Sequence, residues 1–489
     1  MIRLALAALL LAGAADDRPN VLLISTDDQH WKTLSCYRPD GAWPWVETPN
    51  IDRLAAEGVR FTHAYGGAWC IPSRAMLLTG RHTHAIEGLE LGKGWGQTRY
   101  DPARFRFWPA ELRKAGYHTA LVGKWHLGKD TGHGRDWDHT AVWNQDAPRG
   151  DWYNDQAVIV DGGPSQGVPG HATDVFTQFA ADYLARPKGK PWLLWLCYNA
   201  PHLPNTVHPR HRARYEGAEV PVPPDVFGPR EGKPAWARDH TQWERGEPPT
   251  HPDGWGKRAV RKTLPELVRD HNRLVLGIDE GVGRLLKALE ETGQLARTIV
   301  IFTSDQGHAW GEHGFAGKVG PYEACQRMPF LVRWPGVARP GGVSREPASV
   351  VDLGPTILAA AGMKLPWEMH GRDLRPLLEG PETRWERPLL TEHFFRSFGP
   401  ATAGPPEPHD GVPWWIALRQ GRHKYIRTLV EGEIDELYDL EADPAESRNL
   451  ALDPSSRATL EALRGALVAE LRRTGAPLVD RLPVPRAGY

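Results

Sequence analysis

Four short apolar runs constrain the fold of this chain more than any other feature. They read "NVLLIST", "YHTALVG", "WLLWLCY" and "TIVIFTS", and their composition suits strands that are buried on both faces. Helical patterns lie between them; residues 264–293, for example, repeat Leu267, Leu274, Ile278 and Leu285 on one face. Alternating strands and helices predict an α/β fold with a mostly parallel central sheet flanked by helices.

Some parts of the chain do not follow this alternation. Residues 129–170 and about 199–262 are dense in Gly, Pro, Trp and charge, so we expect long loops that shape a binding cleft. After about residue 385, runs such as "WWIALRQGRHKYIRT" predict antiparallel strands, and a leucine-patterned helix follows them. For this chain of 489 residues we predict a catalytic domain over residues 16–384 and a smaller C-terminal α+β subdomain, built on an antiparallel sheet, over residues 385–489.

The N-terminus has the layout of an export signal. Arg3 precedes an apolar run from Leu4 to Leu11, and small residues lead up to Asp16, which predicts a signal peptide over residues 1–15. A buried first helix is the alternative, but "DDRPN" would interrupt it just before a strand. No other apolar run approaches the roughly 20 residues that span a bilayer. We therefore expect a secreted or periplasmic protein without a membrane span.

Charge and cysteine content argue against two classes of protein. The 59 basic and 60 acidic residues nearly cancel, and no polybasic tract indicates a nucleic-acid partner. The four cysteines have no close spacing, so a disulfide framework is not indicated, although Cys36 and Cys325 could pair. Cys197 lies within an apolar run and fits a small buried residue.

Chemically useful side chains follow each of the four apolar runs. In open α/β sheets the ligand site lies beyond the carboxyl ends of the strands, so these side chains are expected to converge. They are Asp27 and Asp28, then Lys124 and His126, then Asn199 and His202, and finally Asp305 and Gln306.

Three carboxylates and one amide oxygen in this set suit a hard cation. Asp27, Asp28, Asp305 and Gln306 offer only oxygen ligands, which favours Ca²⁺ or Mg²⁺ over zinc. A single Asp after a strand is as readily a helix cap or a turn residue. Two such pairs after similar strands favour a metal site.

Cys70 lies at the start of a predicted helix, in "WCIPSRAMLLTGR". Pro72 fits the first helical turn and Gly80 fits its end, which puts Cys70 at the positive N-terminus and Arg74 one turn away. A buried structural cysteine and a thiolate nucleophile are both open. A soft thiolate matches a hard cation poorly, so an oxygen nucleophile would fit better. In the loop "GEHGFAGK", Lys318 alone reads as a solvated lysine and His313 as a structural residue.

These segments together resemble the type I sulfatases of the alkaline phosphatase-like superfamily. "CIPSR" matches the family's Cys-x-Pro-Ser-Arg motif, and "RPNVLLISTDDQ", "GKWHLG", "NAPH" and "FTSDQG" with "GEHGFAGK" are similar to its other site segments in the same order. In that family a maturation enzyme oxidises the motif cysteine to formylglycine, whose hydrated aldehyde is the nucleophile. The resemblance therefore implies that Cys70 is an aldehyde precursor.

The resemblance also implies a ligand set for the metal. Asp27, Asp28, Asp305 and Gln306, with the modified Cys70, would bind one divalent cation, most often Ca²⁺ in this family. Gln306 departs from the usual pattern, because many relatives have Asn or His at this position.

The remaining matched residues receive catalytic roles in the same way. Arg74 and Lys124 would hold the diol, and His126 would take a proton from it as sulfate is expelled. His202 and Lys318 would contact the sulfate group and help to protonate the leaving alcohol.

Two other functions remain open. Phosphate and sulfate esters are nearly isosteric, so a phosphodiesterase, phosphatase or phosphonate monoester hydrolase of the same superfamily is one alternative. A non-catalytic secreted glycan-binding protein is the other, prompted by 21 tryptophans, among them Trp43, Trp45, Trp95 and Trp255 in predicted loops. The complete set of polar site residues favours a sulfatase, and export with Trp-rich loops favours a sulfated carbohydrate as its substrate.

Overall fold

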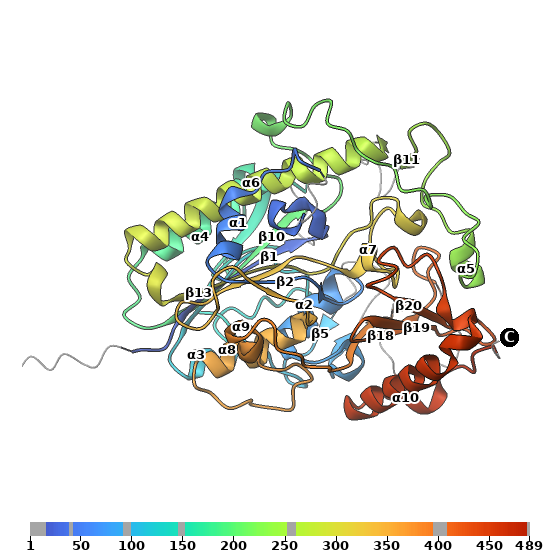
Figure 1. The fold of residues 1–489 in the computed structure, drawn as a ribbon. Coiled ribbons are helices and arrows are strands. Elements are labelled where there is room, and N and C mark those ends of the chain that lie inside the picture. Colours follow the sequence, from blue (N-terminus) through green and yellow to red (C-terminus); the bar gives the residue numbers. More distant parts are fainter. Residues whose placement is uncertain are drawn as a thin grey trace, which may run out of the picture.

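The computed structural model describes residues 16–38, 43–90, 99–144, 152–251, 261–394 and 408–486. The predicted signal peptide, together with Trp95 and Trp255, lies outside the described residues. Within them the chain forms a large α/β body and, toward the C-terminus, a second and smaller sheet with its own helix (Figure 1).

A ten-stranded sheet forms the centre of the α/β body. From one edge to the other the strands are β15 (Gly342–Ser344), β2 (Val59–Phe61), β14 (Phe330–Arg333), β13 (Thr298–Ser304), β1 (Asn20–Asp27), β10 (Trp192–Pro201), β6 (His118–Lys124), β7 (His139–Trp143), β8 (Asn154–Val160) and β9 (Ser165–His171). The five neighbouring strands from β13 to β7 in this order are parallel to one another. The other neighbouring pairs are antiparallel, except for β15 with β2, which is parallel.

The four apolar runs of the sequence are β1, β6, β10 and β13, and they are neighbours in this sheet. Along β1, Leu22 and Ile24 face one hydrophobic core, whereas Val21 and Leu23 face the other. Burial on both faces explains why these strands are continuously apolar. The predicted fold class, a mostly parallel sheet flanked by helices, is confirmed.

Helices cover both faces of the sheet (Figure 1). On one face α1 (Pro49–Ala56), α4 (Ala172–Ala185) and α6 (Leu264–Glu291) pack together over one core. The opposite core includes residues of α2 (Cys70–Thr79), α3 (Trp108–Lys114), α8 (Leu353–Ala360) and α9 (Arg375–Glu379).

Helix α6 follows the sequence signals closely. Thr263 caps its start in a reciprocal capping box with Glu266, which satisfies two backbone donors that the first turn leaves unpaired. Leu274 and Ile278 are buried in the core on the sheet, and Leu267 is buried in a smaller cluster that includes Trp243 and Trp310.

The C-terminal sheet is antiparallel and carries its own core. Its strands, in order, are β17 (Leu389–His393), β18 (Trp415–Gln420), β19 (His423–Thr428) and β20 (Glu436–Asp439). Helix α10 (Arg457–Arg473) buries Leu460, Leu463, Leu467 and Leu471 against it. The predicted antiparallel sheet is therefore confirmed, and the domain boundary at residue 385 stays a prediction.

The prediction of a long loop over residues 129–170 is wrong. Strands β7, β8 and β9 lie in this stretch and extend the sheet to its far edge. Most of β9 is exposed, so it has no apolar run that would reveal it. The described part of residues 199–262 is largely irregular, with only short elements such as α5 (Ala235–Arg238) and β11 (Thr250–His251).

Several further short elements lie outside the two larger sheets. They are the pairs β3 (Ala64–Tyr65) with β16 (Ala348–Ser349), β4 (Leu89–Glu90) with β5 (Arg99–Tyr100) and β11 with β12 (Lys262–Thr263), and the helix α7 (Glu323–Gln326).

Two general predictions can be compared with the structure. All four cysteines carry free thiols, so Cys36 and Cys325 do not pair. Among the described residues, no helix is both long enough and apolar enough to cross a membrane.

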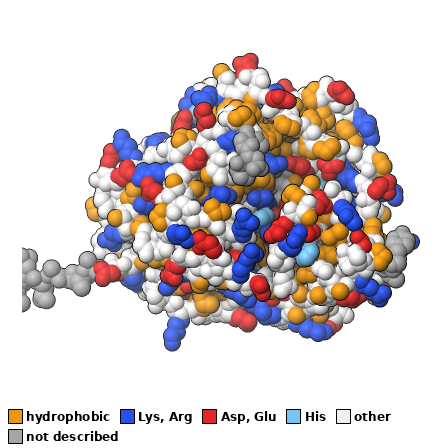
Figure 2. Space-filling model, in the orientation of Figure 1, with side chains coloured by type: hydrophobic (Ala, Val, Ile, Leu, Met, Phe, Trp, Pro, Cys, Tyr) orange, Lys and Arg blue, Asp and Glu red, His pale blue; other side chains and the backbone are white. Residues whose placement is uncertain are grey.

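Acidic and basic side chains are intermixed over the face seen in Figure 2, in keeping with the near-zero net charge.

Candidate active site

The polar residues predicted to form a site lie at one end of the central sheet, where its parallel strands end. Asp27 is the last residue of β1, and Lys124 is the last residue of β6. His202 directly follows β10, and Asp305 directly follows β13. Because these strands are neighbours, side chains far apart in the sequence meet at one place.

Cys70 is the first residue of α2, as predicted, and the helix ends at Gly80, whose φ of +69° suits a glycine. Its Sγ atom lies 3.3 Å from Asp27 Oδ1, 3.1 Å from Lys318 Nζ and 3.5 Å from Gln306 Nε2. Burial, together with the negative charge of Asp27, raises the pKa of the Cys70 thiol to about 12. The thiol is therefore protonated at neutral pH, and a protonated thiol is a weak nucleophile.

Asp27 is fully buried between cationic side chains. Its Oδ2 atom accepts a hydrogen bond from Nζ of Lys124, and the Arg74 guanidinium lies 3.6 Å from the same oxygen. Burial opposes ionisation, but the positive charge of Lys124 holds the pKa of Asp27 well below its ordinary value. Arg74 also donates to the Lys124 carbonyl at 2.7 Å, which ties α2 to the end of β6.

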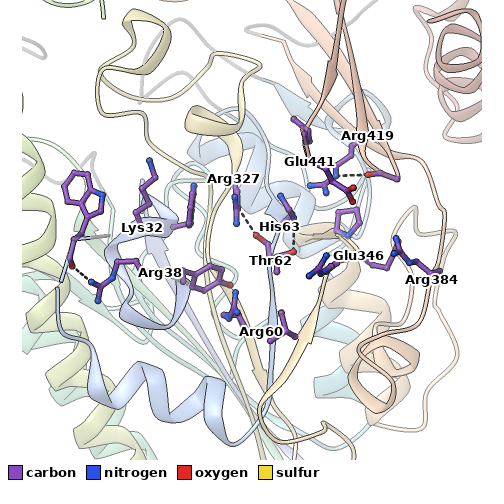
Figure 3. A pocket seen from close by; sticks show the side chains of 18 residues that line it. Lys32, Arg38, Arg60, Thr62, His63, Arg327, Glu346, Arg384, Arg419 and Glu441 are labelled. Carbon is purple, nitrogen blue, oxygen red and sulfur yellow. Dashed lines mark hydrogen bonds between the residues drawn. The ribbon is translucent and has the colours of Figure 1, made fainter. Parts of the chain in front are cut away.

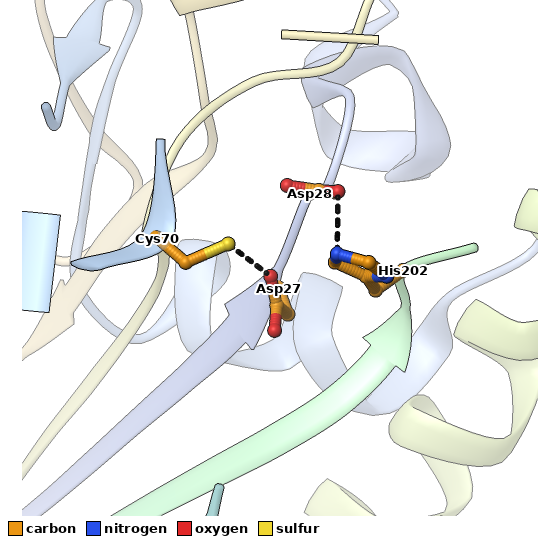
Figure 4. A group of neighbouring side chains, drawn as sticks. All are labelled: Asp27, Asp28, Cys70 and His202. Atoms are coloured by element: carbon orange, nitrogen blue, oxygen red, sulfur yellow. Dashed lines mark hydrogen bonds and ion pairs between the residues drawn. The ribbon is translucent and has the colours of Figure 1, made fainter. Parts of the chain in front are cut away.

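Asp28 connects the loop after β1 to Lys318 and His202. Nζ of Lys318 lies 2.7 and 2.8 Å from the two Asp28 carboxylate oxygens. Nε2 of His202 lies 3.5 Å from Asp28 Oδ2, and Figure 4 shows both aspartates between the cysteine and the histidine. Lys318, which the sequence alone would leave in solvent, is therefore part of the cluster.

The orientation of the His202 ring is fixed by two neighbours. The ring stacks on Trp152, with centroids 4.6 Å apart and planes within 7°. Its Nδ1 atom lies 2.6 Å from the Leu203 carbonyl. A carbonyl only accepts hydrogen bonds, so Nδ1 carries the hydrogen in the neutral ring and Nε2, which faces Asp28, does not. Burial and the charge of Lys318 lower the pKa of His202 to about 4.

Asp305 and Gln306 close the cluster from the end of β13. Asp305 Oδ1 accepts the backbone N–H groups of Asp28 and Gln306 at 3.1 and 3.0 Å, and Oδ2 lies 3.2 Å from the Arg74 guanidinium. Burial and the negative charge of Asp27 raise the pKa of Asp305 to about 7. The Gln306 amide nitrogen donates to Asp28, and its oxygen accepts from Ser73 Oγ at 3.2 Å.

This cluster fits a divalent cation. Ligand atoms of Asp27, Asp28, Cys70 and His202 lie within 4.8 Å of one another, which makes these four a possible metal site. Asp305 is not part of that tight group, and its oxygens are bound by backbone N–H groups and by Arg74. Burial, followed by the negative charge of Asp27, raises the pKa of Asp305, and a hard cation would offset the negative charge of these buried carboxylates.

Gln306, the predicted ligand that departs from the usual pattern, can still offer oxygen to a cation. Its amide presents nitrogen to Asp28, and half a turn about the last side-chain bond would exchange nitrogen and oxygen. The surroundings of Cys70 would also suit hydroxyl groups at the position of its sulfur. Lys318 could donate a hydrogen bond to such a hydroxyl, and Asp27 could accept one from it.

His126 lies at the same end of the sheet, two residues after β6. It is buried, and its backbone adopts the left-handed region with φ of +66°. Burial, with the charges of Lys124 and Arg74, lowers the pKa of His126 well below its ordinary value, so the ring is neutral and can accept a proton.

Sequence reasoning missed three residues of the cluster. Trp152 stacks on His202, Ser73 Oγ binds Gln306, and the buried His308 lies close enough for the charge of Asp28 to act on its pKa. The signal for Ser73 and His308 was available, because they belong to "CIPSR" and "FTSDQGH". His313 lies elsewhere, 2.9 Å from Asp225, as expected for a structural residue.

Comparisons with known proteins agree with this geometry. The sulfatase family model matches residues 19–363, and a model of the C-terminal part of N-sulphoglucosamine sulphohydrolase matches residues 311–473. An N-acetylglucosamine-6-O-sulfatase of Bacteroides thetaiotaomicron is 31% identical over 91% of this chain and 86% of its own. The chain therefore belongs to the sulfatase family.

Solved structures extend the comparison to the fold. A protein in complex with its substrate D-glucosamine-2-N, 6-O-disulfate is 27% identical, with a TM-score of 0.80 over 95% of this chain and 99% of that chain. A phosphonate monoester hydrolase of Agrobacterium radiobacter, 22% identical with a TM-score of 0.70 over 94% of this chain and 96% of its own, shares the fold. The protein is an alkaline phosphatase-like hydrolase of sulfate esters.

Proposed function

We propose that the protein removes sulfate from a sulfated carbohydrate, using Cys70 oxidised to formylglycine and a bound divalent cation. The observation that carries this proposal is the position of Cys70: it begins a helix, lies against Asp27 and Lys318, and has a thiol that stays protonated. Such a thiol is a poor nucleophile. Conversion by a formylglycine-generating maturation enzyme would supply a hydroxyl nucleophile at this position.

The residues for the cation are Asp27, Asp28, Asp305 and Gln306, with residue 70 as a further ligand. When bound, a divalent cation lowers the cost of ionising a hydroxyl group and polarises a sulfate oxygen. Calcium is the first candidate because the donors are carboxylate and amide oxygens, and Mg²⁺ is the second.

The other side chains have separate tasks around the transferred group. Arg74 and Lys124 are fixed cations beside Asp27 and orient residue 70. Neutral His126 is the base that removes a proton during sulfate release. Lys318 is the protonated group nearest Cys70, so it stabilises sulfate charge and can protonate the leaving alcohol. His202, held in place by its stack on Trp152, would contact the sulfate group and help to protonate the leaving alcohol once Nε2 carries a hydrogen.

The substrate class is inferred from the named relatives. One relative is an N-acetylglucosamine-6-O-sulfatase, and one structural neighbour holds D-glucosamine-2-N, 6-O-disulfate as its substrate. Both support a sulfated glucosamine as the first substrate to try.

Free sulfate release from a panel of sugar sulfates tests the proposal. The protein is produced with and without a formylglycine-generating enzyme, and the peptide that spans Ala68–Arg74 is examined by mass spectrometry in each batch. Turnover should follow the fraction of residue 70 converted to the aldehyde, and Cys70→Ser should lose multiple turnover. An active batch in which Cys70 is wholly a thiol would overturn the formylglycine mechanism.

Matched substrates separate the alternative functions. An aryl sulfate and an aryl phosphate with the same leaving group should differ strongly in kcat/KM, in favour of the sulfate. Preference for the phosphate would instead favour a phosphatase or phosphonate hydrolase, and glycan binding without any sulfate release would favour a non-catalytic protein.

We also propose that the protein is exported to the periplasm or the cell exterior. The apolar run after Arg3 and the small residues up to Ala15 support a cleaved signal peptide. N-terminal sequencing of the mature protein should begin near Asp16, and an intact N-terminus on protein from the cytoplasm would contradict export.

A further inference from the structure

A second, strongly basic pocket lies outside the candidate active site. Its volume is about 550 Å³, within the range of small-ligand sites. None of its lining residues belongs to the candidate active site. Lys32 contributes one cation, and only Glu346 and Glu441 contribute acidic charge. The remaining cations are six arginines, several of which surround a common space in Figure 3: Arg38, Arg60, Arg327, Arg345, Arg384 and Arg419.

The pocket forms where the free edge of the large sheet meets the C-terminal sheet. Arg60 lies in β2, and Arg345 follows β15, which is the edge strand. Arg419 lies in β18, and Glu441 follows the end of β20. Both sheets therefore contribute walls, so the cavity is a fixed feature of their packing.

Three of the arginines are held by protein groups. Arg327 Nε donates to the Thr62 carbonyl at 2.8 Å while its guanidinium lies over the Trp31 ring at 3.8 Å. Arg419 donates to the Tyr65 hydroxyl at 2.6 Å. Arg38 donates to backbone carbonyls of the 43–46 segment. These direct partners are neutral, while the carboxylates Glu323, Glu346 and Asp52 act on the three arginines through space and offset part of their charge.

The other three arginines are available to a ligand. Arg345 and Arg384 are exposed and Arg60 is half-buried, with its guanidinium 5.1 Å from the Tyr37 ring centre. With the part of the chain that the structure describes, these three form no ion pair and no side-chain hydrogen bond. Like charges held around one cavity repel, and an anion with several charged groups would relieve this repulsion.

The aromatic walls favour a saccharide over a nucleic acid or a lipid surface. Trp31 and Trp43 are partly exposed in the same cavity, with one face of Trp31 covered by Arg327, and Tyr37 is buried behind Arg60. Aromatic rings pack on the apolar faces of sugar rings while guanidinium groups bind sulfate or carboxylate. The cavity is also concave and bounded, whereas a membrane would need an extended basic face.

We propose that this pocket binds an anionic segment of a sulfated glycan, separately from the catalytic centre. Trp31 follows Asp28 by three residues, so their Cα atoms are at most about 11 Å apart, which places the Trp31 wall of the pocket near the candidate active site. A glycan longer than the unit being desulfated can therefore contact both places. The choice of a glycan rests on the proposed function, but binding of a polyanion by the pocket does not require turnover.

Calorimetric titration of a heparin-type hexasaccharide tests the proposal. The full-length Cys70→Ala protein serves as the background, so that no substrate is consumed. The Arg345→Ala/Arg384→Ala pair should raise the Kd by roughly tenfold or more, because charged hydrogen bonds are lost. The same hexasaccharide after chemical desulfation should bind at least about tenfold more weakly to the background protein.

A matched pair of variants controls for net charge. Arg186 and Arg297 are also exposed and line no part of this pocket, so Arg186→Ala/Arg297→Ala removes the same charge elsewhere. Its Kd should stay close to that of the background protein. If both pairs weaken binding equally, or if single-stranded DNA of equal charge binds as tightly as the hexasaccharide, attraction is non-specific and the proposal fails.

The remaining outcomes are also decisive. No binding of the hexasaccharide, or an unchanged Kd in the Arg345→Ala/Arg384→Ala protein, overturns the proposal. Thermal unfolding confirms that each variant is folded, and Arg60→Gln provides a second test should the Arg345→Ala/Arg384→Ala protein fold poorly.

With Cys70 intact, the pocket variants should desulfate a monosaccharide at the wild-type rate. A protein that releases no sulfate yet loses glycan binding in the pocket variants would refute the proposed function and retain the pocket.

Discussion

The ammonium nitrogen of Lys318 lies 3.1 Å from the thiol sulfur of Cys70. The same nitrogen is bound by both carboxylate oxygens of Asp28. Burial opposes the charge of Lys318, but Asp28 raises its pKa above the ordinary value. Lys318 is therefore a fixed positive charge next to the atom that the proposed mechanism modifies.

Replacing Lys318 with methionine should remove that charge while keeping the length of the side chain. We expect kcat to fall by about 10²–10³, the range found when one stabilising donor is removed from an active site. Steady-state kinetics on a sugar sulfate measures the effect. Lys287→Met, at an exposed position of α6, is the matched control and should retain wild-type kcat. A kcat close to wild type in Lys318→Met would remove Lys318 from the chemical step.

Removal of the cation should abolish turnover, and added calcium should restore it. A second readout does not depend on activity. At a free calcium concentration about a hundred times the Kd for calcium, the free energy of unfolding should be about 2.7 kcal/mol higher than without calcium. Asp305→Asn should reduce this stabilisation, whereas Asp182→Asn, on the exposed side of α4, should not. Full turnover in protein shown by elemental analysis to be free of metal would contradict the metal site.

His126→Ala should separate the two halves of the reaction. If the imidazole acts only when sulfate is released, the variant should still give a burst of the leaving alcohol and then stall. Rapid-quench measurement of the alcohol and of free sulfate distinguishes transfer of sulfate to the enzyme from its later release. The variant His313→Ala, outside the cluster, should show no such burst. Normal multiple turnover in His126→Ala would exclude this role.

The sequence predicts the centre of the fold better than its edges. Strand β1 is buried on both faces, so its apolar run is continuous and easy to recognise. Strand β9 is mostly exposed and contains Pro169 and two glycines, so its composition resembles that of a loop. Burial on only one face, or on neither, leaves a strand without the pattern on which such predictions depend.

The candidate active site could be predicted because its residues follow strands and a helix start. Cys70 and Gly80 mark the two ends of α2 in the sequence itself. Trp152 could not be predicted, because its stack on His202 joins two separate segments and no pattern in the sequence marks that contact. The basic pocket was also hidden, since its arginines come from separate segments and form no run of charge.

A buried ion cluster beside the C-terminal sheet should be important for stability. Lys424 in β19 lies 3.0 Å from Glu323 and 2.9 Å from Glu446, and all three are buried. Lys424→Met would remove the cation that contacts both buried carboxylates and leave them only the more distant Arg419, Arg327 and Lys233, so the free energy of unfolding should fall by about 3–5 kcal/mol. Urea denaturation at neutral pH measures this change. Lys287→Met should change stability by less than roughly 0.5 kcal/mol, and a similarly small effect for Lys424→Met would contradict the argument.

Asp279 in α6 should make stability depend on pH. Its carboxylate accepts hydrogen bonds from the Ile51 backbone N–H and the Asn50 amide, both at 2.8 Å, and so connects α6 to α1. Burial raises the pKa of Asp279 to about 6 from an ordinary value of 3.8. Between those pH values the folded protein holds a proton that the unfolded chain has released, so the free energy of unfolding falls as pH rises through this window.

In Asp279→Asn the side chain at residue 279 cannot ionise, so the free energy of unfolding of this variant should lack the fall with rising pH. Between about pH 4 and pH 7, the wild-type protein should lose roughly 2–3 kcal/mol of unfolding free energy relative to Asp279→Asn, because each pKa unit corresponds to about 1.4 kcal/mol. Urea denaturation across this range gives both curves, and Asp182→Asn, at an exposed position, should follow the wild-type curve. Parallel curves for the wild type and Asp279→Asn would mean that Asp279 keeps an ordinary pKa in the folded protein.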